Sequence, residues 1–167
     1  MSKAALGWGH ININVSNLDR SVAFYELLGF RRFMPGIPYL QLEEARAGAM
    51  HEDSAAALGL PAGVRGRACI MGLDDGFPKL DLTELAVGAQ ASPLANADLG
   101  VVRICLSSRD LPGDYERLTA AGVEFLSAPA PAASGLADLA VCRDPDGTLI
   151  EVVQIYLDRW ARLADDG

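Results

Sequence analysis

The sequence predicts an α+β fold in which two copies of a strand, helix, strand, strand, strand unit follow one another. Two sets of three residues have the same spacing. Leu18 and Gly29 follow His10 by eight and nineteen residues, and Leu111 and Gly122 follow Arg103 by the same two distances. Residues 10–15 alternate polar and apolar side chains with a period of two, which is typical of a strand. Two further apolar runs, 67–73 and 79–87, are separated by a turn sequence, which indicates a hairpin.

In the first copy, the strand at residues 10–15 is expected to place His10, Asn12 and Asn14 on one face. A helix should begin near Leu18, capped by Ser16 or Asn17, and Gly29 should end it. Residues 30–34 predict a second strand, which the sequence Pro35-Gly36-Ile37-Pro38 interrupts.

The stretch from residue 39 to residue 63 has no counterpart in the second copy, and we interpret residues 37–63, approximately, as an insertion. Residues 43–46 and 51–58 have helical composition within it. The predicted strands at 67–73 and 79–87, joined at Asp74-Asp75-Gly76, complete a first module at residues 1–89.

Residues 90–99, rich in Ala, Ser, Pro and Asn, are interpreted as a linker. The second module, 100–155, repeats the order of elements along the chain: a strand at 102–107, a helix at 111–121, a strand at 123–126, a loop at 128–134, and strands at 139–143 and 148–155. The tail, 156–167, is expected to hold a short helix whose Trp160 packs back on the body.

Composition excludes several classes of protein. No apolar run approaches the roughly 20 residues that cross a bilayer, and Met1-Ser2-Lys3 lacks a signal-peptide pattern, so a cytoplasmic protein is expected. A net charge of -8 disfavours nucleic acid as a partner, because phosphate binding relies on clustered Lys and Arg. Cys69, Cys105 and Cys142 are odd in number and show no CxxC spacing, which argues against disulfides and a zinc knuckle.

The sequence resembles the vicinal oxygen chelate superfamily, which includes glyoxalases, bleomycin-resistance proteins and extradiol dioxygenases. The matching pieces span nearly the whole chain: Gly9-His10-Ile11, Leu18-Asp19-Arg20-Ser21, Phe24-Tyr25, Leu28-Gly29-Phe30, Ala121-Gly122-Val123-Glu124-Phe125 and Arg143-Asp144-Pro145-Asp146-Gly147-Thr148-Leu149-Ile150-Glu151. Leu58-Gly59-Leu60-Pro61, followed by residues 65–82, is similar to the methylmalonyl-CoA-epimerase-like branch. The resemblance implies two tandem βαβββ modules that form a half-open eight-stranded barrel, and commonly a homodimer.

The resemblance also implies four site positions on the concave face of the barrel, which in this sequence are His10, Asp81, Arg103 and Glu151. Asp81 is chosen because Leu80-Asp81-Leu82 aligns with Ile150-Glu151-Val152, each after a turn. Glu84 should point to the opposite face of its strand, and it becomes the alternative if the register slips. Strand alternation adds four expected substrate contacts: Asn12, Thr83, Cys105 and Ser107.

Arg103 decides between a metal site and a metal-free one. Relatives that use a metal carry a ligand at all four positions, whereas a guanidinium stays charged and has no lone pair to donate. A fixed cation about 4 Å from a divalent ion costs several kcal/mol even at a dielectric near 20. We therefore favour no cofactor; the alternative is a divalent metal held by His10, Asp81 and Glu151.

The leading hypothesis is an enzyme, an isomerase, epimerase or lyase, that transfers a proton next to a carbonyl in a small carbonyl or carboxylate compound. Arg103 would stabilise the enolate oxygen, His10 and Glu151 would be the acid/base pair, and Asp81 would orient His10 or Arg103. The alternatives are a metal-free binding protein of the resistance type and a metal-dependent glyoxalase- or dioxygenase-like enzyme. In a purely structural interpretation, Arg103, Asp81 and Glu151 form a salt-bridge network between the modules.

Two further residues have ordinary interpretations beside functional ones. Cys105 is a small buried hydrophobe in the ordinary interpretation and a nucleophile in the other, for which only Arg103 favours the thiolate. His51 is interpreted as an exposed residue of the insertion, unless the insertion closes over the barrel as a lid.

Overall fold

A computed structural model describes residues 6–87, 92–132 and 135–165, and the chain divides into two compact units, residues 1–90 and 91–167. None of the helices in the described ranges is long and apolar enough to cross a membrane. Each unit is built around one five-stranded sheet, so that the expected α+β class and the two βαβββ modules are confirmed. The curling of both sheets into one half-open barrel stays a prediction.

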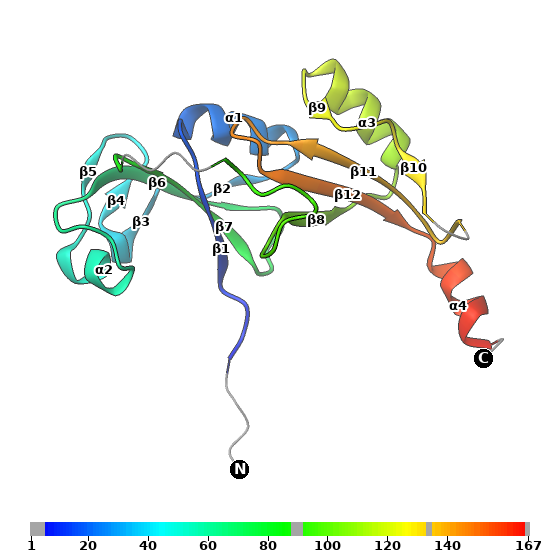
Figure 1. Cartoon of the computed structure of the whole chain (residues 1–167), viewed down its shortest axis with the longest axis horizontal. Helices are drawn as coiled ribbons and strands as arrows, with labels where there is room; N and C mark the ends of the chain where they lie inside the picture. Colours follow the sequence, from blue (N-terminus) through cyan, green and yellow to red (C-terminus); the bar gives the residue numbers. More distant parts are fainter. Residues whose placement is uncertain (1–5, 88–91, 133–134, 166–167) are drawn as a thin grey trace, which may run out of the picture. The chain divides into compact units, whose positions relative to one another are not determined.

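In the first unit, the sheet has the strand order β1-β7-β6-β2 (Figure 1). Four of its five strands are β1 (His10–Asn14), β7 (Lys79–Leu85), β6 (Arg65–Gly72) and β2 (Arg31–Met34). β1 runs parallel to β7, whereas β6 is antiparallel to both of its neighbours. The parallel pairing brings the first strand of the module beside its last strand, and with them the polar face that begins at His10.

Helix α1 (Leu18–Leu27) connects β1 to β2 and buries one side of itself. Asn17 caps it, since its side-chain oxygen accepts a hydrogen bond from the Arg20 N–H at 2.9 Å. Buried apolar side chains recur at helical spacing along it: Leu18, Val22 and Tyr25. Gly29 has φ of 97°, the left-handed conformation that ends a helix and favours glycine.

The insertion holds short elements at one end of the first sheet: β3 (Gly36–Ile37), a 3₁₀ turn η1 (Pro38–Leu40), β4 (Leu42–Glu43), β5 (Gly48–Ala49) and α2 (Glu52–Ala57) (Figure 1). The helix expected at 43–46 was wrong, because Leu42 and Glu43 pair with Ile37 and Gly36 in a β-hairpin. The helix expected at 51–58 is α2. A small apolar cluster that includes Ile37, Leu42 and Ala68 packs the insertion against β6.

The second unit repeats this plan with the strand order β10-β11-β12-β8. Its elements are β8 (Arg103–Ser107), α3 (Leu111–Ala120), β9 (Glu124–Phe125), β10 (Ala130–Pro131), β11 (Ala137–Arg143) and β12 (Leu149–Ile155). β8 runs parallel to β12, as β1 does to β7. Residues 128–134, expected as a loop, contain the short strand β10, and residues 133–134 lie outside the described ranges. Gly122 has φ of 90°, close to the value at Gly29.

The tail forms helix α4 (Leu157–Asp165), within residues 156–167, where a short helix was expected. Trp160 Nε1 donates a hydrogen bond to the Leu136 carbonyl at 3.0 Å, so that this side chain contacts the second unit as predicted.

Candidate functional site

In the first unit, three side chains from different elements meet on one face of the sheet. His10 stands at the start of β1, Asp81 in the middle of β7 and Tyr39 in the turn η1. His10 Nε2 lies 3.6 Å from Asp81 Oδ2, and the Tyr39 hydroxyl donates a hydrogen bond to the same oxygen at 3.0 Å. The ring of Tyr39 stacks on that of His10, with centroids 6.3 Å apart. An imidazole, a carboxylate and a phenol are therefore in mutual contact.

Asp81 is the most unusual residue of this cluster, because it is charged in water but only 1% exposed here. Its Oδ1 has no hydrogen-bond partner within the described parts of the chain. Burial raises the pKa of Asp81, although the hydrogen bond from Tyr39 and the nearby His10 act in the opposite direction. The carboxyl group thus has a raised affinity for a proton.

Tyr39 was missed by sequence analysis, since it lies in the insertion and nothing in its spacing relates it to His10. Burial and the hydrogen bond to Asp81 raise the pKa of Tyr39 to about 12, so the phenol keeps its proton at any working pH. The only signal in the sequence is an aromatic residue directly after Pro38. A proline followed by an exposed aromatic is too common to identify a site.

The predicted substrate contacts of the first unit, Asn12 and Thr83, continue the polar face. Thr83 Oγ1 donates a hydrogen bond to Asn12 Oδ1 at 2.8 Å, and Asn12 Nδ2 donates to Asn14 Oδ1 at 3.1 Å. Thr83 is buried whereas Asn12 is exposed. The row of polar side chains along β1 and β7 therefore extends from His10 to Asn14.

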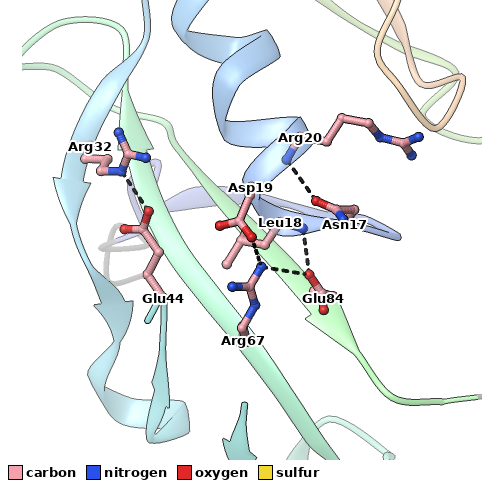
Figure 2. Close-up of polar contacts among 8 residues, drawn as sticks. All are labelled: Asn17, Leu18, Asp19, Arg20, Arg32, Glu44, Arg67 and Glu84. Carbon is pink, nitrogen blue, oxygen red and sulfur yellow. Dashed lines mark hydrogen bonds and ion pairs between the residues drawn. The ribbon is translucent and has the colours of Figure 1, made fainter. Parts of the chain in front are cut away.

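Glu84 lies on the other face of β7 and belongs to a different set of contacts, which Figure 2 shows. Its Oε2 accepts a hydrogen bond from the Leu18 N–H at 2.6 Å, at the start of α1. Arg67 Nη2 lies 3.2 Å from the same oxygen and 2.8 Å from Asp19 Oδ2. Glu84 thus holds the helix and the sheet together, and Asp81, not Glu84, is the residue beside His10.

The second unit repeats this division of roles at equivalent positions. Gln154 Oε1 accepts a hydrogen bond from the Leu111 N–H at 2.8 Å, and it follows Glu151 by three residues, as Glu84 follows Asp81. In the register of the parallel strands, Asp81 pairs with Asn12 and Glu151 pairs with Cys105, each two residues after the first residue of its strand. Asp81 and Glu151 therefore occupy corresponding positions in their units.

Arg103 and Glu151 form an ion pair within the second unit. Arg103 Nε lies 2.5 Å from Glu151 Oε2, and Arg103 Nη1 donates a hydrogen bond to Asn96 Oδ1 at 3.0 Å. The Arg103 side chain is 38% exposed to solvent and the Glu151 side chain 19%. The guanidinium is thus held between a carboxylate and an amide, while both partners stay accessible to solvent.

Cys105 and Ser107 follow Arg103 at every second residue of β8, and all three are exposed. Partial desolvation of its thiol and the neighbouring Glu151 carboxylate raise the pKa of Cys105, against a smaller opposing effect of Arg103. A raised pKa leaves little thiolate at neutral pH, which disfavours Cys105 as a nucleophile.

His51 lies directly before α2, and it lines a hollow of about 420 Å³ that also includes Tyr39. The other lining residues come from η1, its flank and α2: Pro38, Gln41, Asp53, Ser54 and Ala57. The insertion thus supplies both Tyr39, which contacts Asp81, and the walls of a hollow next to Tyr39.

A family model described as Glyoxalase/Bleomycin resistance protein/Dioxygenase superfamily matches residues 7–152. None of the curated proteins matches the chain.

Several solved structures are similar to the chain over nearly its whole length. A glyoxalase family protein from Bacillus cereus shares 20% identity with a TM-score of 0.73, over 93% of this chain and 98% of that one. A glyoxylase/bleomycin resistance protein/dioxygenase domain from Frankia sp. shares 18% identity with a TM-score of 0.60, over 93% of each chain. The trypanothione-dependent glyoxalase I of Leishmania major shares 22% identity with a TM-score of 0.58, over 98% of this chain and 95% of that one. At these identities the likeness shows the fold alone.

Proposed function

Because this chain belongs to the Glyoxalase/Bleomycin resistance protein/Dioxygenase superfamily, we propose that it is an enzyme that transfers a proton at the carbon next to a carbonyl group. The substrate class is a small carbonyl or carboxylate compound. The observation that carries the proposal is the contact of the accessible His10 imidazole with the buried Asp81 carboxyl group, 3.6 Å apart. Paired titratable groups in such different environments are typical of acid/base sites.

In this proposal His10 is the base. It takes the proton from the carbon, the electron pair of the broken C–H bond moves into the carbonyl group, and an enolate forms. Asp81 then lies beside the imidazolium that results and stabilises it. Return of a proton to the same or the opposite face of the enolate completes an exchange or an epimerisation, so that atoms and charge balance without a further reactant.

Arg103 and Glu151 of the second unit have the remaining proposed roles. Arg103 is the proposed donor to the enolate oxygen, since a guanidinium offers several N–H groups and a permanent charge. Glu151 is the proposed second acid/base group. Its hydrogen bond with Arg103 holds the Glu151 carboxylate beside the proposed donor to the enolate oxygen.

The absence of a metal cofactor belongs to the same proposal, and the chemistry of the donor set supports it. Glu151, one of the three potential ligands, already binds a guanidinium that cannot lose its charge. Burial raises the pKa of Asp81, so a proton competes more strongly with a metal ion for this carboxylate. These residues are therefore a poor ligand set for a divalent ion.

Hydrogen exchange at carbon tests the proposal without knowledge of the natural substrate. The protein is incubated in D2O with a panel of 2-substituted carboxylates, their thioesters and small ketones, and loss of the proton signal next to the carbonyl is followed by NMR. We expect exchange with at least one compound class, and a reduction of about 10²-fold or more in His10→Gln, which is typical for loss of an acid/base group. Exchange that persists at the wild-type rate in His10→Gln and Asp81→Asn contradicts the proposal.

The second candidate is a metal-free binding protein for a planar aromatic compound. It is favoured by exposed aromatic side chains in the first unit, where Phe33 and Phe77 are 56% and 62% exposed. Both rings contact the buried Lys79, with centroids 4.9 and 5.4 Å from its Nζ, so they lie near one another. Binding of an aromatic dye that Phe33→Ala and Phe77→Ala abolish, with no carbon exchange on the whole panel, would favour this candidate.

A further inference from the structure

Tyr39 connects two features of the first unit, because its hydroxyl and ring contact Asp81 and His10 while the same residue lines the hollow of the insertion. We propose that Tyr39 is a positioning residue of the acid/base pair and that the hollow binds the distal part of the substrate, an uncharged group rich in hydroxyls. This inference deepens the proposed function and rests on it.

The position of Tyr39 is fixed by contacts within the insertion. Ser54 Oγ, from α2, donates a hydrogen bond to the Tyr39 carbonyl at 2.6 Å, and the His51 N–H donates to the Leu40 carbonyl at 3.0 Å. Gln41, which follows η1, has φ of 57°, a left-handed conformation that non-glycine residues rarely adopt. Strained backbone of this kind persists where the surroundings hold it, and it is commonest at functional sites.

The size of the hollow suits part of a small molecule. Its volume of about 420 Å³ falls within the range of roughly 300–1,000 Å³ that is typical of ligand pockets. Pro38 and Ala57 give it apolar surface, and the other five lining residues carry polar groups. A substrate whose reacting carbon lies beside His10 would reach this hollow past the ring of Tyr39.

The lining residues determine the chemical class of the group that binds. Gln41 and His51 offer both donors and acceptors, which match hydroxyl groups because a hydroxyl also donates and accepts. Asp53 brings a negative charge to the same wall, and it would repel a phosphate or a carboxylate. The hollow therefore favours a neutral hydroxylated group over an anionic one.

The phenol of Tyr39 acts on Asp81 through a hydrogen bond that favours the charged carboxylate. The titratable groups that contact the Asp81 carboxyl in the described structure are His10 from β1 and Tyr39 from η1. Loss of the phenol leaves His10 as the remaining neighbour, so the pKa of Asp81 should rise further. A side chain with a merely structural role would lower the amount of folded protein without such a shift.

A fragment-binding experiment tests the hollow without any turnover. Glucose, glycerol and inorganic phosphate are titrated separately into the ¹⁵N-labelled full chain, and amide shifts are followed at Gln41, Ser54 and Ala57. Ala57→Leu places a larger side chain in the hollow, while Ala56→Leu, on an exposed residue of the same helix that does not line it, is the matched control. We expect saturable shifts with glucose that weaken about tenfold or more in Ala57→Leu and change less than about twofold in Ala56→Leu. Stronger shifts with phosphate, no shifts with glucose, or equal effects of the two variants would overturn the assignment of the hollow.

The role of Tyr39 is tested with a matched pair of tyrosines. Tyr39→Phe removes the hydrogen bond to Asp81, and Tyr156→Phe removes a similar Tyr–Asp hydrogen bond of 2.7 Å to Asp138 in the second unit. In the D2O exchange assay we expect Tyr39→Phe to move the pH–rate profile to higher pH, and Tyr156→Phe to leave the profile in place. An unmoved profile in a folded Tyr39→Phe protein overturns the positioning role. Saturable glucose binding alongside full exchange activity of His10→Gln would refute the proposed function while leaving the hollow intact.

Discussion

Glu84 accepts a hydrogen bond from the backbone N–H of Leu18 at 2.6 Å, and this contact ties the start of α1 to the back of β7. In the second unit the neutral amide of Gln154 accepts the corresponding hydrogen bond from the Leu111 N–H. We therefore predict that Glu84→Gln keeps most of the stability, whereas Glu84→Ala lowers the free energy of unfolding by about 1–2 kcal/mol, as loss of a helix cap does. Urea unfolding measures both. Equal losses in the two variants would show that the charge contact with Arg67 matters more than the cap.

A second prediction concerns the pH dependence of stability at Asp81. Burial raises the folded-state pKa of this carboxyl above its ordinary value of 3.8. The stabilisation that this shift gives the folded protein is therefore fully present below pH 3.8 and is lost as the pH rises through the folded-state pKa. Asp81→Asn does not titrate, so its stability relative to the wild type should increase with pH across this interval. The stability difference should therefore favour the variant more at pH 7 than at pH 4.

The measurement for Asp81 is urea unfolding of both proteins at several pH values between 4 and 7, with pH 4 lying near the ordinary pKa. Asp138→Asn, which alters the acceptor for Tyr156 in the second unit, is the control. A stability difference between Asp81→Asn and the wild type that does not change with pH would contradict the raised pKa. Carbon exchange by Asp81→Asn should fall even as its stability rises.

A third prediction uses the cysteines as reporters of the Arg103–Glu151 pair. Burial raises the pKa of Cys69 to about 12 and that of Cys142 to about 11, so the exposed Cys105 should be alkylated first by iodoacetamide at neutral pH. Glu151→Gln removes a neighbour that raises the pKa of Cys105 and should speed its alkylation. Arg103→Gln removes the neighbour that lowers it and should slow the reaction. Peptide mass spectrometry measures both rates, and changes in the same direction would contradict the assigned contacts.

A fourth prediction asks whether His10 and Glu151 serve one reaction. Each single change to Gln should slow carbon exchange by about 10²-fold. If both residues act in the same proton transfer, the double variant should lose far less than the product of the two, because residues that act as a unit are not additive. Rates of exchange in D2O for the four proteins decide this. If the loss of exchange rate in the double variant equals the product of the two single losses, the two residues act in separate steps.

The repeated plan of the fold could be predicted because it depends on local patterns. Helix starts, the glycines at helix ends and the alternation in β1 follow from capping, backbone conformation and pleating, all of which are set within a few residues. The position of Asp81 beside His10 was also predictable, since the aligned segments around Asp81 and Glu151 fix the register of the last strand in each unit.

The insertion could not be predicted in the same way. Residues 43–46 have good helix formers, but Leu42 is 1% exposed and its burial against β6 holds this segment in a hairpin. Tertiary packing here overrides helix propensity. Tyr39 was missed for a related reason, because its contact with Asp81 spans 42 residues and depends on how the whole insertion folds back on the sheet.

The two faces of β7 separate the anchoring of α1 from the row of polar side chains along β1 and β7. Glu84 serves the helix behind the sheet, while Asp81 and Thr83 serve the polar row in front of it. A protein engineer could therefore substitute side chains on the front of this strand and leave the anchoring of the helix untouched. The same freedom exists at Glu151 and Gln154, which gives the scaffold two independently adjustable positions.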